Sequence, residues 1–269
     1  MFCIIHIVMI ASQQIKSTTS CPVNLENYEA VNVLKWNNSK WKNLCPYLLE
    51  TDGNEKYYNG GGIIFENFYQ GCKIYDIVYE NEVYPHKSFI NNPKYLWWRY
   101  KTVNQKGDVI YDKENDVINY ELYLRWRDSL WKCEKPIRYP NKIYNRKNTQ
   151  FSICIDKKGK THRYDYIKSR KKIYAREYIR LIKQLPEYLE LFNKLKNGKN
   201  IMICEVDVPA NNKKGEYGRD CDKNNICHLT RKKLKILLND TNEAYGHGLC
   251  LAHSLLKDLR KYKKINNLK

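Results

Sequence analysis

Apolar and polar positions along the chain follow two periods, and together they predict a mixture of strands and helices. The run at 200–208 is apolar and contains β-branched residues, which predicts a buried strand. Segments 151–155 and 161–167 flank a lysine- and glycine-containing turn at 157–160, which predicts a β-hairpin. A second hairpin is predicted over 100–118, where a glycine-containing turn precedes an apolar triplet.

Helices are predicted where apolar residues recur every three or four positions. The segments with this spacing are 66–79, 119–131, 168–196, 230–239 and 249–262. Pro186 lies inside the third segment, and it either breaks that helix or starts a second one at its first position. Thr230 is the expected N-cap of the fourth segment because its hydroxyl can accept a hydrogen bond from the first turn.

These elements predict an α+β fold that is rich in helices, with one domain over 21–269 that contains a β-rich insertion. The apolar run at 1–11 is too short to span a bilayer and has no basic residues at its start. A buried strand, or an upstream start-site artefact, is therefore favoured over a signal peptide, and residues 1–20 have no assigned role. No other segment approaches transmembrane length, so no membrane partner is expected.

The formal net charge of +19 has two interpretations. It can reflect a polyanionic partner, either nucleic acid or a phosphorylated substrate. It can equally reflect an AT-rich coding genome, because the abundant Lys, Asn, Ile and Tyr residues have AT-rich codons. Basic residues cluster at 168–180 and at 257–264, and a solvated helix surface is the simplest account of both clusters.

Ten cysteines are spread along the chain without a CxxC pair, and their spacing matches no common zinc signature. Without a clear secretory signal they are expected to be reduced and mostly buried, which indicates an intracellular, cytoplasmic protein. Cys221, Cys227 and His228 lie close together and are the combination that could bind zinc. P-loop, nucleophile-elbow and zincin motifs are absent from the sequence, which argues against those enzyme classes.

Two segments resemble the NADAR (YbiA-like) N-glycosidases. The first is FENFYQGCK at 65–73, which is similar to that family's EHYFQAxK-like helix start and follows WKNLCP at 41–46. The second, at 246–260, is similar to the family's closing GKNxLGxxLMxxR-like helix. The resemblance implies a YbiA-like α+β fold, and the segment 84–165, which has no counterpart there, is interpreted as the insertion.

The resemblance also implies hydrolysis of the C–N bond between a ribose and a base, without a metal or an organic cofactor. The substrate would be a phosphorylated ribosyl metabolite, such as a riboflavin-pathway intermediate, or ADP-ribose attached to nucleic acid. Such a reaction passes through an oxocarbenium-like transition state that a carboxylate can stabilise. Glu66 is the candidate catalytic carboxylate, and Asp207 is a second one at the end of the 200–208 strand.

Eight further residues are candidates for binding the substrate: Asn43, Tyr69, Gln70, Arg170, Lys171, Gly246, His247 and Gly248. Tyr69 would stack on a base, and Gln70 would hydrogen-bond its edge. Arg170 and Lys171 would bind phosphate oxygens. The turn at 246–248 would offer backbone N–H groups at the start of a helix. Each residue also has a structural interpretation, as a core residue, a turn residue or part of a charged helix face.

The alternative function is nonspecific nucleic-acid binding by a basic protein that keeps this scaffold without catalysis. Aromatic residues interleaved with basic ones at 95–100 would suit base stacking, although core packing is the favoured interpretation of them. The position of Glu66 distinguishes the two functions. Its convergence with Asn43, Gln70 and the turn at Gly246 in one pocket favours an enzyme, whereas a salt bridge on a flat basic surface favours a binding protein.

Overall fold

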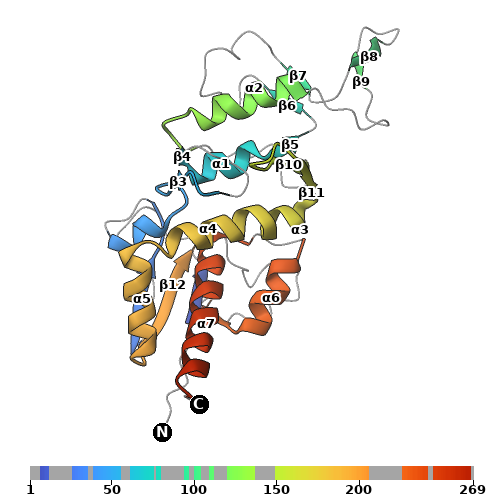
Figure 1. The fold of residues 1–269 in the computed structure, drawn as a ribbon. Helices are drawn as coiled ribbons and strands as arrows, with labels where there is room; N and C mark the ends of the chain where they lie inside the picture. The colour runs from blue at the N-terminus through green and yellow to red at the C-terminus, as the bar shows by residue number, and fades with distance from the viewer. Residues whose placement is uncertain are drawn as a thin grey trace. The chain divides into compact units, whose positions relative to one another are not determined.

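The computed structural model describes residues 7–11, 26–35, 39–55, 61–75, 77–79, 94–96, 100–103, 109–111, 120–136, 149–205, 226–241 and 245–267. They form an α+β fold of helices and small sheets (Figure 1). The chain divides into two compact units, unit 1 (Met1–Leu49 and Arg170–Lys269) and unit 2 (Glu50–Ser169). Unit 2 contains the predicted insertion and begins before it. Among the described helices, none has the length and apolar character that crossing a membrane requires.

Unit 1 contains a four-stranded sheet in the order β13-β1-β12-β2. Its strands are β1 (Ile7–Ala11), β2 (Tyr28–Asn32), β12 (Asn200–Glu205) and β13 (Ile226–Leu229). β12 pairs in parallel with β1 and with β2, and β13 is antiparallel to β1. Ile201 to Cys204 are all buried, as expected for a strand between two parallel neighbours. The strand predicted over 200–208 is confirmed for Asn200–Glu205, and part of the apolar run at 1–11 forms a strand, which was one of its two favoured interpretations.

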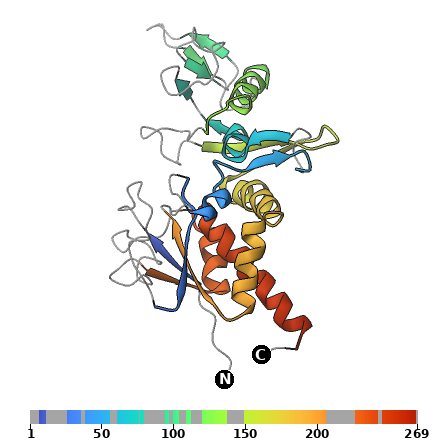
Figure 2. The ribbon, with the colours of Figure 1, turned by 90° about the vertical axis from the view of Figure 1, so that its left-hand side faces the viewer.

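The helices of unit 1 lie against one face of this sheet (Figure 2). They are α4 (Ala175–Ile182), α5 (Pro186–Lys196), α6 (Arg231–Asn239) and α7 (His247–Ile265), together with the 3₁₀-helix η1 (Lys40–Leu44) and the π-helical η4 (Arg170–Tyr174). Pro186 begins α5 and Thr230 caps α6, as predicted. α7 begins two residues before Leu249, at His247, and this difference brings His247 into the first turn of the helix.

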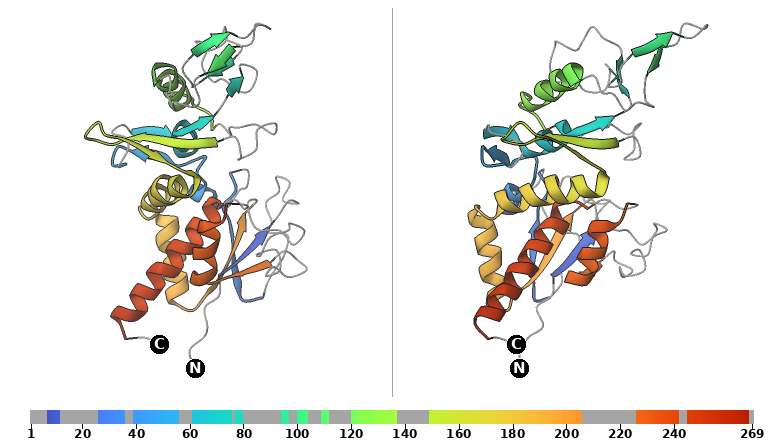
Figure 3. Two further views of the ribbon diagram at one scale, coloured as in Figure 1. Left: turned by 90° about the vertical axis from the view of Figure 1, so that its right-hand side faces the viewer. Right: turned by 45° about the vertical axis from the view of Figure 1, so that its right-hand side comes forward.

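Unit 2 consists of three helices and several short strands (Figure 3). Its helices are α1 (Phe65–Gly71), α2 (Tyr120–Trp131) and α3 (Tyr166–Ser169). Its strands are β3 (Glu50–Asp52), β4 (Gly61–Ile64), β5 (Lys73–Tyr75), β6 (Ile77–Tyr79), β7 (Lys94–Leu96), β8 (Tyr100–Val103), β9 (Val109–Tyr111), β10 (Thr149–Ile155) and β11 (Thr161–Tyr164). Both predicted hairpins are confirmed, as the antiparallel pairs β8–β9 and β10–β11.

The helix predicted over 66–79 is wrong beyond Gly71. α1 ends there, and the chain continues as β5, which pairs with β10 in the order β11-β10-β5. The N–H group of Ile153 donates to the carbonyl of Cys72 at 2.8 Å, so the sheet begins directly after the helix. The three- and four-residue spacing of apolar residues suggested a longer helix, but Ile74 and Tyr75 are residues that favour strands.

Gly71 allows α1 and α2 to approach closely. A β-carbon at this position would lie 2.4 Å from the indole Nε1 of Trp131. The same indole donates to the carbonyl of Phe68 at 3.3 Å, and the hydroxyl of Tyr123 donates to the carbonyl of Gly71 at 3.0 Å. Asn67 is fully buried, and its amide donates to two carbonyls of the segment that follows α2. Polar side chains therefore fix the interface between the two helices.

We predict that Gly71→Ala destabilises the protein by about 1–3 kcal/mol, because the added methyl group overpacks the contact with Trp131. Helix propensity alone would give the opposite sign, a gain of about 1 kcal/mol. Urea unfolding of the wild type and the variant measures the difference. Gly71→Ala combined with Trp131→Leu should lose less than the sum of the two single changes, and additive losses would contradict the proposed clash.

Candidate functional site

The predicted site residues fall into two sets. Glu66, Tyr69 and Gln70 lie on α1 in unit 2. The remaining described ones belong to unit 1: Asn43, Arg170, Lys171, Gly246, His247 and Gly248. Asp207 lies outside the described residues. Each set has its own contacts, and its chemistry follows from them.

Glu66, Gln70 and Lys73 form a hydrogen-bonded chain along α1 and the start of β5. The amide nitrogen of Gln70 lies 2.5 Å from Glu66 Oε1, and Lys73 Nζ lies 2.8 Å from Gln70 Oε1. Glu66 and Gln70 are only 8% and 5% exposed. These three residues are among those that carry the resemblance to the N-glycosidases. The spacing of Glu66 and Gln70 places both on one side of α1, and Lys73 follows at the start of β5.

The donor and acceptor roles in this chain follow from Lys73. An ammonium group can only donate, so the carbonyl oxygen of Gln70 faces Lys73 and its NH₂ group faces Glu66. Glu66 Oε1 is therefore an acceptor in this hydrogen bond, a role that either oxygen of an ionised carboxylate or the carbonyl oxygen of a protonated one can fill. Its place in the first turn of α1 also favours negative charge, because the helix dipole is positive there.

Tyr69 completes this group of side chains. Lys73 Nζ lies 4.4 Å from the centre of the Tyr69 ring, a cation–π contact, and Tyr69 is buried. One face of the ring is thus next to the ammonium group, so stacking on a base, as predicted, would use the other face. The sequence analysis included Lys73 in the motif but gave it no role. Its position seven residues after Glu66 was the feature that could have indicated a contact with this group.

In unit 1, the turn at 246–248 is bound by Glu205. The N–H group of Gly248 donates to Glu205 Oε2 at 2.9 Å, and His247 Nδ1 lies 2.7 Å from the same oxygen. Glu205 is the last residue of β12, and it is buried. A carboxylate of the protein thus lies where the sequence suggested a phosphate, at the N-terminus of α7. The position of Glu205, an acidic residue at the end of an apolar strand, was the feature of the sequence that could have indicated this role.

Both ring nitrogens of His247 face acceptors. Nδ1 faces Glu205, and Nε2 lies 3.1 Å from the carbonyl oxygen of Val33. The edge of the His247 ring also packs against Tyr178, with 6.1 Å between ring centres. Burial raises the pKa of Tyr178 well above its usual value, so its hydroxyl stays protonated and donates to the carbonyl of Leu44 at 2.7 Å. The pair of His247 and Glu205 therefore shares at least one proton and joins α7 to β12.

Arg170 is buried at the C-terminal end of α6. One terminal nitrogen of its guanidinium group lies 3.1 Å from the carbonyl oxygen of Leu237 and 2.6 Å from that of Asp240, and the residue is 2% exposed. The last carbonyls of a helix lack partners within the helix, and a cation there also suits the dipole. The guanidinium of Arg170 thus holds a helix end, in place of the solvated helix face that was expected.

Lys171 and Asn43 make contacts near the surface. Lys171 Nζ lies 2.5 Å from the side-chain oxygen of Asn239. The amide of Asn43 donates to Glu187 on α5 at 2.6 Å, and Asn43 is exposed. Their predicted roles in substrate binding stay predictions, because neither contact involves the other candidate residues.

The cysteines differ in part from expectation. Cys227 is disulfide-bonded, so the expectation of reduced thiols is wrong for this residue. His228 is exposed whereas Cys227 is buried, as adjacent positions on opposite faces of β13 require. Cys221, the third residue of the suggested zinc combination, lies outside the described residues. Within the described part of the chain, no group of three metal-binding side chains occurs.

Comparison of the chain with protein-family models, with curated proteins and with solved structures finds no match. The resemblance to the NADAR N-glycosidases therefore depends on the short segments quoted above and on the contacts that their residues make.

We predict that Arg170→Met lowers the free energy of unfolding by about 1.5–3 kcal/mol, because the end of α6 loses its charged donor. Lys171→Met removes the same charge from the adjacent residue and should cost less than about 0.5 kcal/mol. Chemical denaturation of both variants gives the comparison. Equal losses would show that charge, and not capping of α6, accounts for the effect.

We also predict that Glu205→Leu costs about 3–5 kcal/mol, because it leaves His247 and the Gly248 N–H group buried without their acceptor. Glu205→Gln should cost less, since its carbonyl oxygen can still accept one of these hydrogen bonds. Thermal and urea unfolding measure both changes. A Glu205→Leu variant as stable as the wild type would contradict the structural role of this carboxylate.

Proposed function

We propose that this protein is an N-glycosidase that hydrolyses the C–N bond between a ribose and a base, with Glu66 as the catalytic carboxylate. Its substrate is a phosphorylated nucleotide-like metabolite or ADP-ribosylated nucleic acid. The observation that carries the proposal is the buried chain of Glu66, Gln70 and Lys73, whose members are also the residues that resemble the family motif.

An ionised carboxylate at Glu66 is the form that this hydrolysis requires. Departure of the base leaves positive charge on the ribose ring, and a carboxylate held beside the anomeric carbon lowers the energy of that state. An ionised carboxylate can also orient or deprotonate the attacking water. Both tasks require the ionised form of Glu66, whereas the role of a general acid would require a proton on the carboxyl group.

Gln70 is proposed as a positioning residue. Its amide is fixed between Glu66 and Lys73, so the orientation of the carboxylate depends on both. Burial of the carboxylate increases its electrostatic effect on a nearby cation because the local dielectric constant is low. Buried carboxyl groups are rare in proteins, and they are concentrated at functional sites.

A second candidate function is nucleic-acid binding without catalysis. It is favoured by the exposed lysines at the turn between β10 and β11, which form no ion pair within the described part of the chain. The glycosidase requires the carboxylate of Glu66, whereas nucleic-acid binding without catalysis does not.

We predict that Glu66→Gln abolishes ribose release, with a fall on the order of 10²–10⁴-fold in rate, because the amide cannot stabilise the developing cation or accept a proton. The assay incubates the protein with phosphoribosylated pyrimidines, free ADP-ribose conjugates and ADP-ribosylated DNA. Glu134→Gln is the matched control, since Glu134 is an exposed acid of the same unit. Equal release by wild type and Glu66→Gln would refute the role of Glu66, and no release from any of these substrates by the wild type would favour the binding function.

A further inference from the structure

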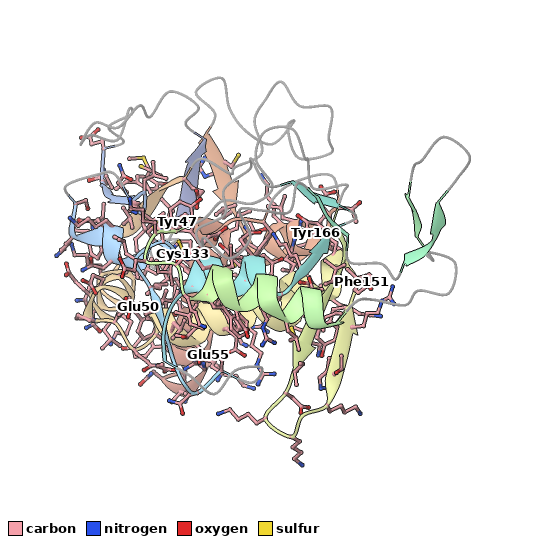
Figure 4. All side chains as sticks on the ribbon, turned by 90° about the horizontal axis from the view of Figure 1, so that it is seen from above. Tyr47, Glu50, Glu55, Cys133, Phe151 and Tyr166 are labelled. Carbon is pink, nitrogen blue, oxygen red and sulfur yellow. The ribbon has the colours of Figure 1, made fainter. Side chains whose placement is uncertain are left out.

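The hairpin of β10 and β11 has a basic tip. Residues 157–160 read Lys-Lys-Gly-Lys, and all four are exposed. Gly159 has a φ angle of +77°, so the tip depends on a residue that tolerates the left-handed region. Figure 4 shows the two strands running from the labelled Phe151 to a turn whose long side chains end in nitrogen and point away from the ribbon.

The side chain of Asp156 stabilises this turn by hydrogen bonds to its backbone. Asp156 Oδ1 accepts hydrogen bonds from the N–H groups of Lys158 and Lys160, at 2.9 and 3.0 Å. Its other oxygen lies 2.7 Å from His162 Nε2. The hydrogen bond from His162 lowers the pKa of Asp156 below its usual value, so the carboxylate stays ionised in this turn. Asp156 thus bonds to the backbone and to His162, and it forms no ion pair with the lysines of the tip.

Two of the three tip lysines extend from the turn. Lys157 Nζ donates to the carbonyl of Gly53 at 3.2 Å, which ties this lysine to the loop after β3. Lys158 and Lys160 have no side-chain hydrogen bond or ion pair with any described residue. The turn therefore presents two cations on a fixed backbone.

The strands behind the tip carry planar side chains. The rings of His162 and Tyr164 stack with 6.0 Å between their centres and 16° between their planes, and both are half-buried. On the other face of the strand, the guanidinium of Arg163 lies 3.5 Å from the centre of the Phe151 ring, and Arg163 is exposed. Cations that track a phosphate backbone, next to rings on which bases can stack, are typical of nucleic-acid-binding surfaces.

β5 pairs with β10 from Thr149 to Ser152, and the N–H group of Ile153 still donates to the carbonyl of Cys72. Ile153 and Cys154 are buried, so the hairpin is an exposed two-stranded ribbon only beyond Cys154. A ribbon of two strands has the width that the major groove of a duplex admits, and it can equally lie along a single strand. The tip begins three residues beyond Cys154, a distance of about 10 Å at the usual rise of a strand.

We propose that the β10–β11 hairpin is a nucleic-acid-binding element, in which Lys158 and Lys160 contact backbone phosphates. The tip has no apolar side chain that could insert into a membrane, so its chemistry fits nucleic acid better than a lipid surface. This inference does not rest on the proposed glycosidase activity, since phosphate contacts at the tip need no catalytic residue.

The test compares Lys158→Gln/Lys160→Gln with Lys232→Gln/Lys235→Gln, in the full-length protein. The control pair is exposed on α6 in unit 1 and removes the same charge. Fluorescence anisotropy measures binding to a labelled oligonucleotide of about 20 nucleotides, single-stranded and duplex, between about 50 and 200 mM KCl. Circular dichroism checks that both variants fold.

Loss of two phosphate contacts should make the plot of log affinity against log salt concentration less steep by roughly 1.4–1.8. The control pair should keep the wild-type slope. Equal changes in both lysine pairs would overturn the proposal and leave only general surface charge. Absence of oligonucleotide binding by the wild type, or a tip variant that loses binding to vesicles of anionic lipid alone, would also overturn it.

Discussion

Unit 1 depends on the buried carboxylate of Glu205. This group lies where the central strand β12 ends and α7 begins, and it accepts hydrogen bonds from the Gly248 N–H group and from His247. A buried charge costs free energy unless it is paired and hydrogen-bonded, and here the positive end of a helix adds to the two donors. Because His247 also bonds the carbonyl of Val33, this one carboxylate fixes the helix start against the sheet.

The same solution recurs where other elements end. Arg170 satisfies the last carbonyls of α6, Asn67 binds the segment after α2, and Tyr178 donates to the carbonyl that ends η1. Short helices and strands leave many backbone groups without a partner in regular structure, and each buried one is costly. Buried polar side chains supply those partners, which explains how a chain with so many short elements can have a core.

Local patterns in the sequence predicted the elements whose causes are local. The strand at 200–205 was visible as an apolar run, and α6 was visible from Thr230 and its periodic apolar residues. The end of α1 at Gly71 could not be predicted in this way, because α1 ends where β5 begins to pair with β10, which lies far away in the sequence. Arg170 was assigned to phosphate for the same reason, since its partner Leu237 lies 67 positions along the chain and no local pattern indicates it. For Glu66 and Gln70 the sequence indicated their proximity, because four residues make one turn of a helix.

The two proposals share one sheet. Lys73 ends the chain of hydrogen bonds that begins at Glu66, and its backbone pairs with Ser152 in the strand that leads to the basic tip. The carboxylate and the tip lysines are therefore parts of the same unit, and β5 and β10 fix the span between them. Under the two proposals, a small metabolite needs only the site at Glu66, whereas a nucleic acid also contacts the lysines of the tip. If both proposals are correct, the lysine pair should matter for release from ADP-ribosylated DNA and not for release from a phosphoribosylated pyrimidine, because only the polymer uses the hairpin.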